Sequence, residues 1–244
     1  MLKIGKIHLS KSKYCRAVQC NKMLWLDKNK PEEKSKIDEQ DVLENGIKVG
    51  ELAKGIFGDY TDIKYNENLS KMICDTQEAL KKSPNIITEA SFNYQNNFCS
   101  VDILKNNGDN IEIYEVKSST EVKDIYLDDI SYQFYILSNL GYKVNKASVV
   151  YINNQYIRHG ELDLSELFNI EDVTEIVYSK QDEIKNKIIE IEEYMRQNEE
   201  PYCNIGMQCF NPYLCQFWQF CTKNLTENNV FKIKKMKKKE AMNL

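Results

Sequence analysis

The residues whose types and spacing best suit chemistry lie within 101–117, in the stretch VDILKNNGDNIEIYEVK. This stretch is expected to form two short strands joined by a turn, because NNGD supplies residues that tight turns prefer. Alternate residues of a strand face the same way, so Glu115 and Lys117 project together while Val116 faces the other side. The hairpin can then bring Asp102 beside Glu115. Two carboxylates and an ammonium on one patch suit a divalent cation and an activated water, although ordinary charges on a surface strand are the alternative.

The cysteines form a second feature. The chain has eight of them, and four recur every six residues late in the sequence: Cys203, Cys209, Cys215 and Cys221. In a reducing compartment, clustered cysteines are more often metal ligands than disulfides. Pro212 and the neighbouring aromatic residues favour a loop that wraps a ligand over a straight helix. Thiolates in apolar surroundings suit an iron–sulfur cluster. Zinc is the nearest alternative, although the close C-x2-C pairing of many zinc sites is absent, and buried unligated thiols are a third reading.

Three further observations complete the list of candidates. Cys15 or Cys20, in an expected first helix, could supply a distant fourth thiolate. Cys74 and Cys99 stand alone and are expected in the core. Glu89, on the strand before the aspartate, is either a carboxylate behind the metal ligands or an ordinary surface glutamate.

The composition excludes several functional classes. Of the 244 residues 42% are hydrophobic, which is enough for a sizeable core, and the formal net charge is −4. The chain is therefore not a globally basic nucleic-acid binder, and such contacts must rest on local patches. No run approaches the roughly 18 apolar residues of a membrane span, and the N-terminal MLKIGKIHLSKSKY lacks an apolar signal core. We expect a cytoplasmic protein with no membrane partner.

Hydrophobic periodicity predicts an α/β chain with a mixed sheet. Helices are expected over residues 13–26, 41–57, 66–82 and 125–140, and a long charged helix within 166–198. Strands are expected over residues 86–94, 98–105, 111–118 and 147–153. The order is helices, a three-strand meander, a helix and a further strand.

Four motifs together resemble a known family. Asp102, followed by an E-x-K at 115–117 and by a helix with Gln133 and Tyr135, resembles the PD-(D/E)XK nucleases, and more narrowly their RecB-like group. The early cysteine and the late cysteine cluster make the chain similar to the CRISPR-associated iron–sulfur exonucleases. The chain is more similar still to an uncharacterised bacterial family with a nuclease-like N-terminal region. The motifs of that family are V-G-x-L-A, E-V-K-S-S, D-x-x-x-Q-x-Y and P-Y-x-C-x-F-x-x-x-C, and they correspond here to residues 49–53, 115–119, 129–135 and 212–221.

The resemblance implies a fold and a set of roles. The fold would be a restriction-endonuclease-like core, with a mixed central sheet flanked by helices and a Cys-rich iron–sulfur subdomain formed by N- and C-terminal segments. Asp102 and Glu115 would hold Mg²⁺ or Mn²⁺, with the backbone carbonyl of Val116 as a further ligand. Lys117 would orient the attacking water or stabilise the transition state. Gln133 and Tyr135 would support the site or contact the DNA backbone. A 4Fe–4S cluster would be held by four thiolates: Cys20, Cys209, Cys215 and Cys221.

The same resemblance divides the chain into four segments. Residues 1–30 hold an N-terminal helix with one cluster ligand, 31–165 a nuclease core, 166–225 a long helix with the Cys-rich segment, and 226–244 a basic tail. The tail, with its IKKMKKK, either contacts phosphates or is a disordered solubilising end. Cys203 precedes the family pattern and is treated as a spare thiol.

Two departures from the family pattern bear on activity. A His is usual in the second helix, and here its position is Gly50; a Pro usually follows the early Cys, and here it is Asn21. Glu51 either substitutes as a metal-side carboxylate or is a solvated helix residue. The missing His is expected to reduce activity rather than abolish it.

Three functional hypotheses follow. The first is a metal-dependent DNA nuclease, an exonuclease on single-stranded or free ends, in DNA repair, mobile-element defence or CRISPR adaptation, with a protein partner in that process. The second is a catalytically impaired nucleic-acid-binding module with the same fold. The third is a zinc-stabilised interaction domain in which the E-x-K is coincidental.

Overall fold

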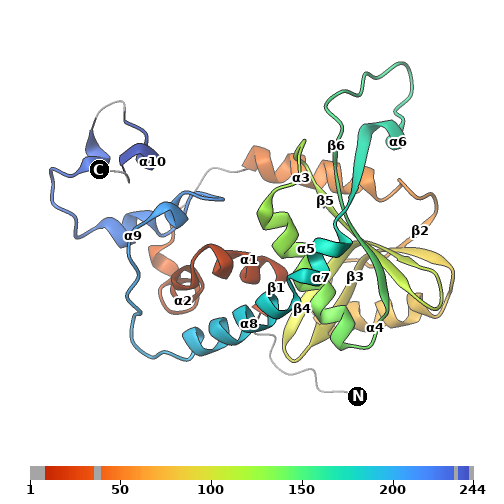
Figure 1. Ribbon diagram of the computed structural model, residues 1–244, viewed down its shortest axis with the longest axis horizontal. Coiled ribbons are helices and arrows are strands. Elements are labelled where there is room, and N and C mark those ends of the chain that lie inside the picture. The colour runs from red at the N-terminus through yellow and green to blue at the C-terminus, as the bar shows by residue number, and fades with distance from the viewer. Residues whose placement is uncertain (1–8, 36–39, 234–235, 242–244) are drawn as a thin grey trace. The chain divides into compact units, whose positions relative to one another are not determined.

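A mixed sheet dominates the structure, a computed structural model that describes residues 9–35, 40–233 and 236–241 (Figure 1). Among these residues seven strands hydrogen-bond in the order β2-β3-β4-β5-β6-β7, and β1 pairs with β4. The strands are β1 (Leu9–Ser10), β2 (Tyr60–Asp62), β3 (Asn85–Tyr94), β4 (Asn97–Asn106), β5 (Ile111–Lys117), β6 (Val144–Ile152) and β7 (Phe168–Asp172). The sheet and its helices confirm the expected mixed α/β class. Parts of the expected segments, at 1–8, 36–39, 234–235 and 242–244, lie outside the described residues.

The described residues also form ten α-helices and three short 3-10 turns. The helices are α1 (Lys11–Gln19), α2 (Asn21–Asn29), α3 (Gln40–Ala53), α4 (Leu69–Leu80), α5 (Asp124–Asn139), α6 (Leu164–Leu167), α7 (Thr174–Ser179), α8 (Gln181–Met195), α9 (Trp218–Thr222) and α10 (Lys238–Ala241). The 3-10 turns are η1 (Pro31–Glu33), η2 (Met207–Cys209) and η3 (Val230–Lys232). No helix in these described ranges has the length and apolar content needed to cross a bilayer.

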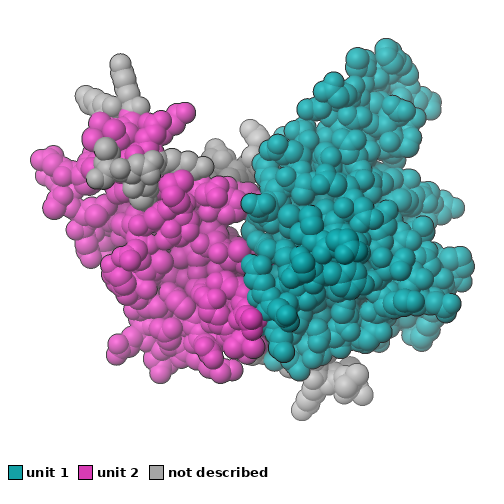
Figure 2. All heavy atoms as spheres, viewed as in Figure 1, with its two compact units in different colours: residues 1–12, 39–185 teal, residues 13–38, 186–244 magenta. Residues whose placement is uncertain are grey.

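The chain divides into two compact units (Figure 2). Unit 1 comprises residues 1–12 and 39–185 and contains the whole sheet with α3 to α7. Unit 2 comprises residues 13–38 and 186–244 and contains α2 and the Cys-rich segment.

In unit 1 the strand alternation sorts side chains onto two faces of the sheet. One face packs on α3 and α6 through an apolar cluster that includes Ala53, Ile103, Tyr114, Val116 and Leu164. Because alternate residues of a strand point in opposite directions, Asp102, Glu115 and Lys117 face the other side, where α5 lies. The turn between β4 and β5 is made with Gly108 at φ +95, a left-handed conformation that glycine adopts without strain.

In unit 2 the core consists of aromatic, aliphatic and thiol side chains. Its buried members are Met23, Trp25, Leu26, Cys215, Phe217 and Phe220. The helix expected over 13–26 is two helices, because Cys20 adopts an extended backbone (φ −165, ψ 113) and caps the start of α2. Cys20 therefore lies between the two helices and not within one, as the sequence pattern had predicted.

Other expected elements differ from the structure for local reasons. Cys74 is exposed, not in the core. The buried positions of α4 are Met72, Thr76 and Ala79, and Cys74 falls between them on the opposite side of the helix. Three short strands, β1, β2 and β7, were not expected because two to five residues carry too little alternation to be recognised.

Candidate functional site

Asp102 and Glu115 lie where two neighbouring strands separate. The antiparallel ladder of β4 and β5 runs from Asn106 opposite Ile111 to Ile103 opposite Tyr114 and then stops. Asp102 and Glu115 occupy the next pair of positions. In place of the ladder bond, the backbone N–H of Val116 donates to Asp102 Oδ2 at 2.8 Å. The two carboxylates therefore stand at the opening of the sheet, on the face that α5 covers.

Helix α5 brings an aspartate and a glutamine to the same point. Asp129 and Gln133 are four residues apart and so share one face of the helix. Gln133 Nε2 donates to Glu115 Oε2 at 2.6 Å and to Asp129 Oδ1 at 3.2 Å. Lys117 Nζ donates to Glu115 Oε1 at 2.6 Å and to Asp129 Oδ2 at 2.7 Å, and it lies 5.2 Å from the ring centroid of Tyr126. Glu115, only 1% exposed, is thus held from two sides.

Lys11 is a further member that sequence reasoning missed. The start of β4 does not pair with β5 and is paired with β1 instead, with Leu9 opposite Asn97. Lys11 follows β1 directly and so lies at the opening between β4 and β5. Lys11 Nζ donates to Glu115 Oε2 at 3.0 Å and to Asp102 Oδ1 at 3.3 Å. It also lies 3.8 Å from Asp129 Oδ1. No motif marks this lysine, whereas Asp129 begins the D-x-x-x-Q-x-Y stretch and could have been recognised.

The charges of this network shift the pKa values of its members in opposite directions. Burial raises the pKa of Asp102 to about 6, and the negative charge of Glu115 adds to the rise. Burial acts on Glu115 in the same direction, but the ammonium groups of Lys11 and Lys117 outweigh it and hold the pKa of Glu115 well below its usual range. Burial alone would lower the pKa of both lysines, yet the surrounding carboxylates raise them. At neutral pH the site therefore holds charged lysines and at least one charged carboxylate.

Glu89 sits beside this site on a strained backbone. The β3–β4 ladder pairs Thr88 with Ile103 and Ala90 with Val101, and the pair between them is missing. Glu89 occupies that gap with φ +57, a left-handed conformation that is uncommon for a residue with a side chain. Burial, together with the negative charge of Asp102, raises its pKa to about 7. Glu89 is therefore a partly buried carboxylate on a strained backbone and not an ordinary surface residue.

Two other predicted participants lie apart from the network. Tyr135 is two residues beyond Gln133, about 200° around the helix axis, and its ring packs edge-on against Tyr94 with centroids 6.3 Å apart. Glu51 is exposed and forms an ion pair at 2.8 Å with the buried Lys54. A Cβ built on Gly50 would meet nothing within 4 Å, so there is room for a side chain where the family pattern has its His.

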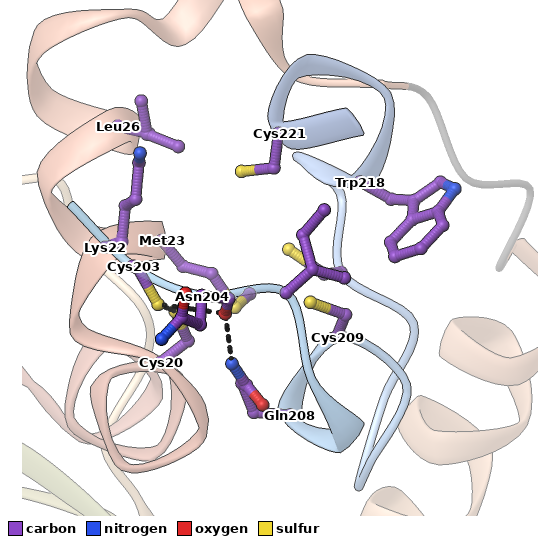
Figure 3. A pocket seen from close by; sticks show the side chains of 12 residues that line it. Cys20, Lys22, Met23, Leu26, Cys203, Asn204, Gln208, Cys209, Trp218 and Cys221 are labelled. Carbon is purple, nitrogen blue, oxygen red and sulfur yellow. Dashed lines mark hydrogen bonds between the residues drawn. The ribbon is translucent and has the colours of Figure 1, made fainter. Parts of the chain in front are cut away.

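Five thiols line one pocket of unit 2 (Figure 3). They are Cys20, Cys203, Cys209, Cys215 and Cys221, and the rest of the lining includes Met23, Leu26 and Trp218. Cys203, set aside as a spare in the sequence analysis, has its Sγ 3.8 Å from that of Cys20. Cys15 is not among the lining residues. Cys20, at the start of α2, therefore lies close to the late cysteines. Cys203 is 183 residues further along the chain.

Burial dominates the chemistry of these thiols. It raises the pKa of Cys20 to about 12, with the neighbouring Cys203 adding to the rise, and that of Cys215 to about 11. The backbone N–H of Phe217 points at Cys215 Sγ at 3.4 Å, the kind of donor that stabilises a thiolate. Uncharged thiols are therefore favoured in the pocket unless a cation compensates their charge.

As placed, the described Cys, His, Asp and Glu side chains include no group of three arranged around a cation position. The carboxylates at the sheet opening converge on lysine ammonium groups instead. Their oxygen atoms are nevertheless the ligands that a hard cation prefers. Of these four residue types, only cysteine lines the pocket of unit 2. Sulfur ligands suit a soft metal or an iron–sulfur cluster.

No family model matches the chain, and a search of curated proteins finds no match. Among solved structures, the crystal structure of an alkaline exonuclease (LHK-Exo) from Laribacter hongkongensis aligns with 74% of this chain and 93% of its own. The sequence identity is 10% and the TM-score 0.31.

Proposed function

We propose that this protein is a metal-dependent nuclease that hydrolyses phosphodiester bonds of DNA, with a preference for single-stranded or free ends. One observation carries the proposal. Asp102, Glu115 and Lys117 converge where β4 and β5 separate, and Asp129 and Gln133 of α5 hold the glutamate and the lysine in place. A buried carboxylate that is tied to a lysine and aimed at an opening of the sheet suits phosphate chemistry better than it suits a structural ion pair.

The donor set fits Mg²⁺ or Mn²⁺. Asp102 and Glu115, with the backbone carbonyl of Val116, would hold the ion. When bound, it would supply positive charge to the phosphate and acidify a water molecule.

The remaining roles belong to the side chains of this chain. The ammonium of Lys117 would orient the attacking water or stabilise the charge that develops on the phosphate. Asp129 accepts from the same ammonium at 2.7 Å and fixes its position. Gln133 donates to Glu115 and so fixes the carboxylate that faces the ion. Tyr135, which the helix directs toward Tyr94, would contribute by contact with the DNA backbone rather than within this network.

The test is cleavage of end-labelled single-stranded DNA in Mn²⁺ by anaerobically purified protein. Glu115→Ala and Lys117→Ala should each lower the rate by about a hundredfold or more. Glu121→Ala, an exposed glutamate in the loop before α5, is the matched control and should cleave normally. A circular strand run in parallel separates a requirement for ends from internal cleavage. Equal cleavage by the wild type and Glu115→Ala would refute the assigned site.

We further propose that unit 2 binds a structural 4Fe–4S cluster through Cys20, Cys209, Cys215 and Cys221. The support is that these thiols, from both ends of the chain, line one pocket with apolar walls. Such a cluster would tie the two segments together in place of a larger apolar core.

Zinc is the competing ligand, and one distance favours it. Metal–sulfur bonds of about 2.3 Å in a tetrahedron place neighbouring sulfurs about 3.8 Å apart, and Cys20 and Cys203 are separated by 3.8 Å. Iron and sulfide analysis of anaerobically purified protein decides between the two. Stoichiometric zinc without iron or sulfide would overturn the cluster.

A second function is a nucleic-acid-binding module without catalysis. The observation that favours it is Lys11, because a second ammonium on the same carboxylates can neutralise them without any metal. Tight binding of single-stranded DNA with no cleavage in Mn²⁺ would select this function. In either case we place the protein in the cytoplasm, in DNA repair, defence or CRISPR adaptation, with a protein partner in that process.

A further inference from the structure

Three carboxylates converge on the ammonium of Lys11. Its Nζ lies 3.0 Å from Glu115 Oε2, 3.3 Å from Asp102 Oδ1 and 3.8 Å from Asp129 Oδ1. An ammonium so surrounded by oxygens occupies the position in which a cation shared by these carboxylates would bind. Lys117, in contrast, contacts Glu115 and Asp129 and has no hydrogen bond to Asp102 among the described residues.

An ammonium and a divalent cation cannot occupy that position together. A cation that contacts carboxylate oxygens at about 2 Å would be within a few ångströms of Lys11 Nζ, where like charges repel strongly in a partly buried site. Lys11 can leave, because its side chain is a flexible four-carbon stem that is 20% exposed and begins at the first residue of α1.

We propose that Lys11 holds the metal position of the site in the metal-free protein and that a divalent cation must displace it in order to bind to Asp102 and Glu115. Lys11 is thus a positioning residue that keeps the two carboxylates together at the sheet opening and sets the metal concentration at which the site fills. This inference rests on the proposed function, because it concerns the same metal position.

The first test measures Mn²⁺ affinity rather than activity. Chelator-treated protein, with all 244 residues, is titrated with Mn²⁺, and free Mn²⁺ is read from its EPR signal. Lys11→Met should lower the Kd by about tenfold or more, because the competing charge is gone. Lys11→Gln, which keeps a hydrogen-bond donor and removes the charge, should behave in the same way and serves if the methionine variant does not fold. Lys13→Met, an exposed lysine of the same helix, should leave the Kd unchanged.

The second test uses the wild type alone. An amine-reactive ester labels exposed lysines, and mass spectrometry compares labelling with and without saturating Mn²⁺. Displacement predicts a several-fold rise at Lys11 and no change at Lys13. Unchanged or reduced labelling of Lys11 overturns the proposal.

The outcomes separate this inference from the proposed function. Mn²⁺ binding with the same Kd, or a higher one, in the Lys11 variants overturns displacement and leaves the nuclease proposal intact. Absence of Mn²⁺ binding in the wild type and in every Lys11 variant overturns both proposals, because no metal position then exists at Asp102 and Glu115.

Discussion

Glu89→Gln should stabilise the protein above neutral pH. In the folded chain Glu89 lies in the gap of the β3–β4 ladder, partly buried and near the charge of Asp102, and its pKa is raised from an ordinary 4.5 to about 7. A carboxylate with a raised pKa opposes folding when it is ionised. Glutamine has nearly the same shape and no charge, so the substitution removes the cost without creating a cavity.

The magnitude follows from the two pKa values. A pKa raised from 4.5 to about 7 corresponds to about 3 kcal/mol at pH well above 7. Glu89 is only partly buried, so solvent screening reduces the expected gain to about 1–2 kcal/mol. In a protein of this size that gain raises Tm by about 3–6 °C. As the pH falls below 7, the folded wild type takes up the proton and the cost shrinks, until it vanishes below the ordinary pKa of 4.5. The gain should therefore shrink to below about 1 kcal/mol near pH 5.

The assay is thermal unfolding of metal-free protein near pH 8 and near pH 5, followed by far-UV circular dichroism. Glu121→Gln, an exposed glutamate in the same unit, is the control and should melt with the wild type at both pH values. A Glu89→Gln variant that melts at or below the wild-type temperature near pH 8 would refute the reasoning. A gain as large near pH 5 would also refute it, because burial of the charge would then not be the cause.

Three further predictions test the two sites. Gln133→Leu should destabilise the protein by about 1–3 kcal/mol, because Glu115 loses its buried amide donor and keeps only the two lysine ammonium groups; urea unfolding measures this, and an unchanged midpoint would contradict it. Mn²⁺ affinity should fall about tenfold per pH unit below about pH 6, since protonation of Asp102 then competes with the ion; a flat profile between pH 5 and 7 in a calorimetric titration would contradict it. Cys215→Ser should lose iron and sulfide while Cys203→Ser retains them; loss in both would make Cys203 a ligand.

Local periodicity was enough to predict that Asp102, Glu115 and Lys117 lie together. Glu115 and Lys117 share a strand face because alternate residues do, and the NNGD turn returns the chain so that Asp102 meets Glu115. Helix geometry, in contrast, separates Gln133 from Tyr135, since residues two apart on a helix face nearly opposite ways.

The sequence pattern predicted only part of the cysteine pocket. The six-residue spacing was enough to single out the late thiols, but the conformation of Cys20 came from a break between α1 and α2 that helical periodicity did not signal. Cys203 falls outside the family motif, and only the folded chain places it against Cys20.

The sequence by itself determined the mixed α/β class, the two strands that carry the E-x-K and its aspartate, and a thiol-rich segment. Those features depend on neighbours a few residues apart, and backbone geometry fixes how such neighbours face. The tertiary structure alone decided that Lys11 reaches Asp102 and Glu115, which lie 91 and 104 residues away. It also decided that Glu89 is strained at a gap in the ladder. These contacts depend on the pairing of β1 with the part of β4 that β5 does not cover, and no local pattern in the sequence encodes that pairing.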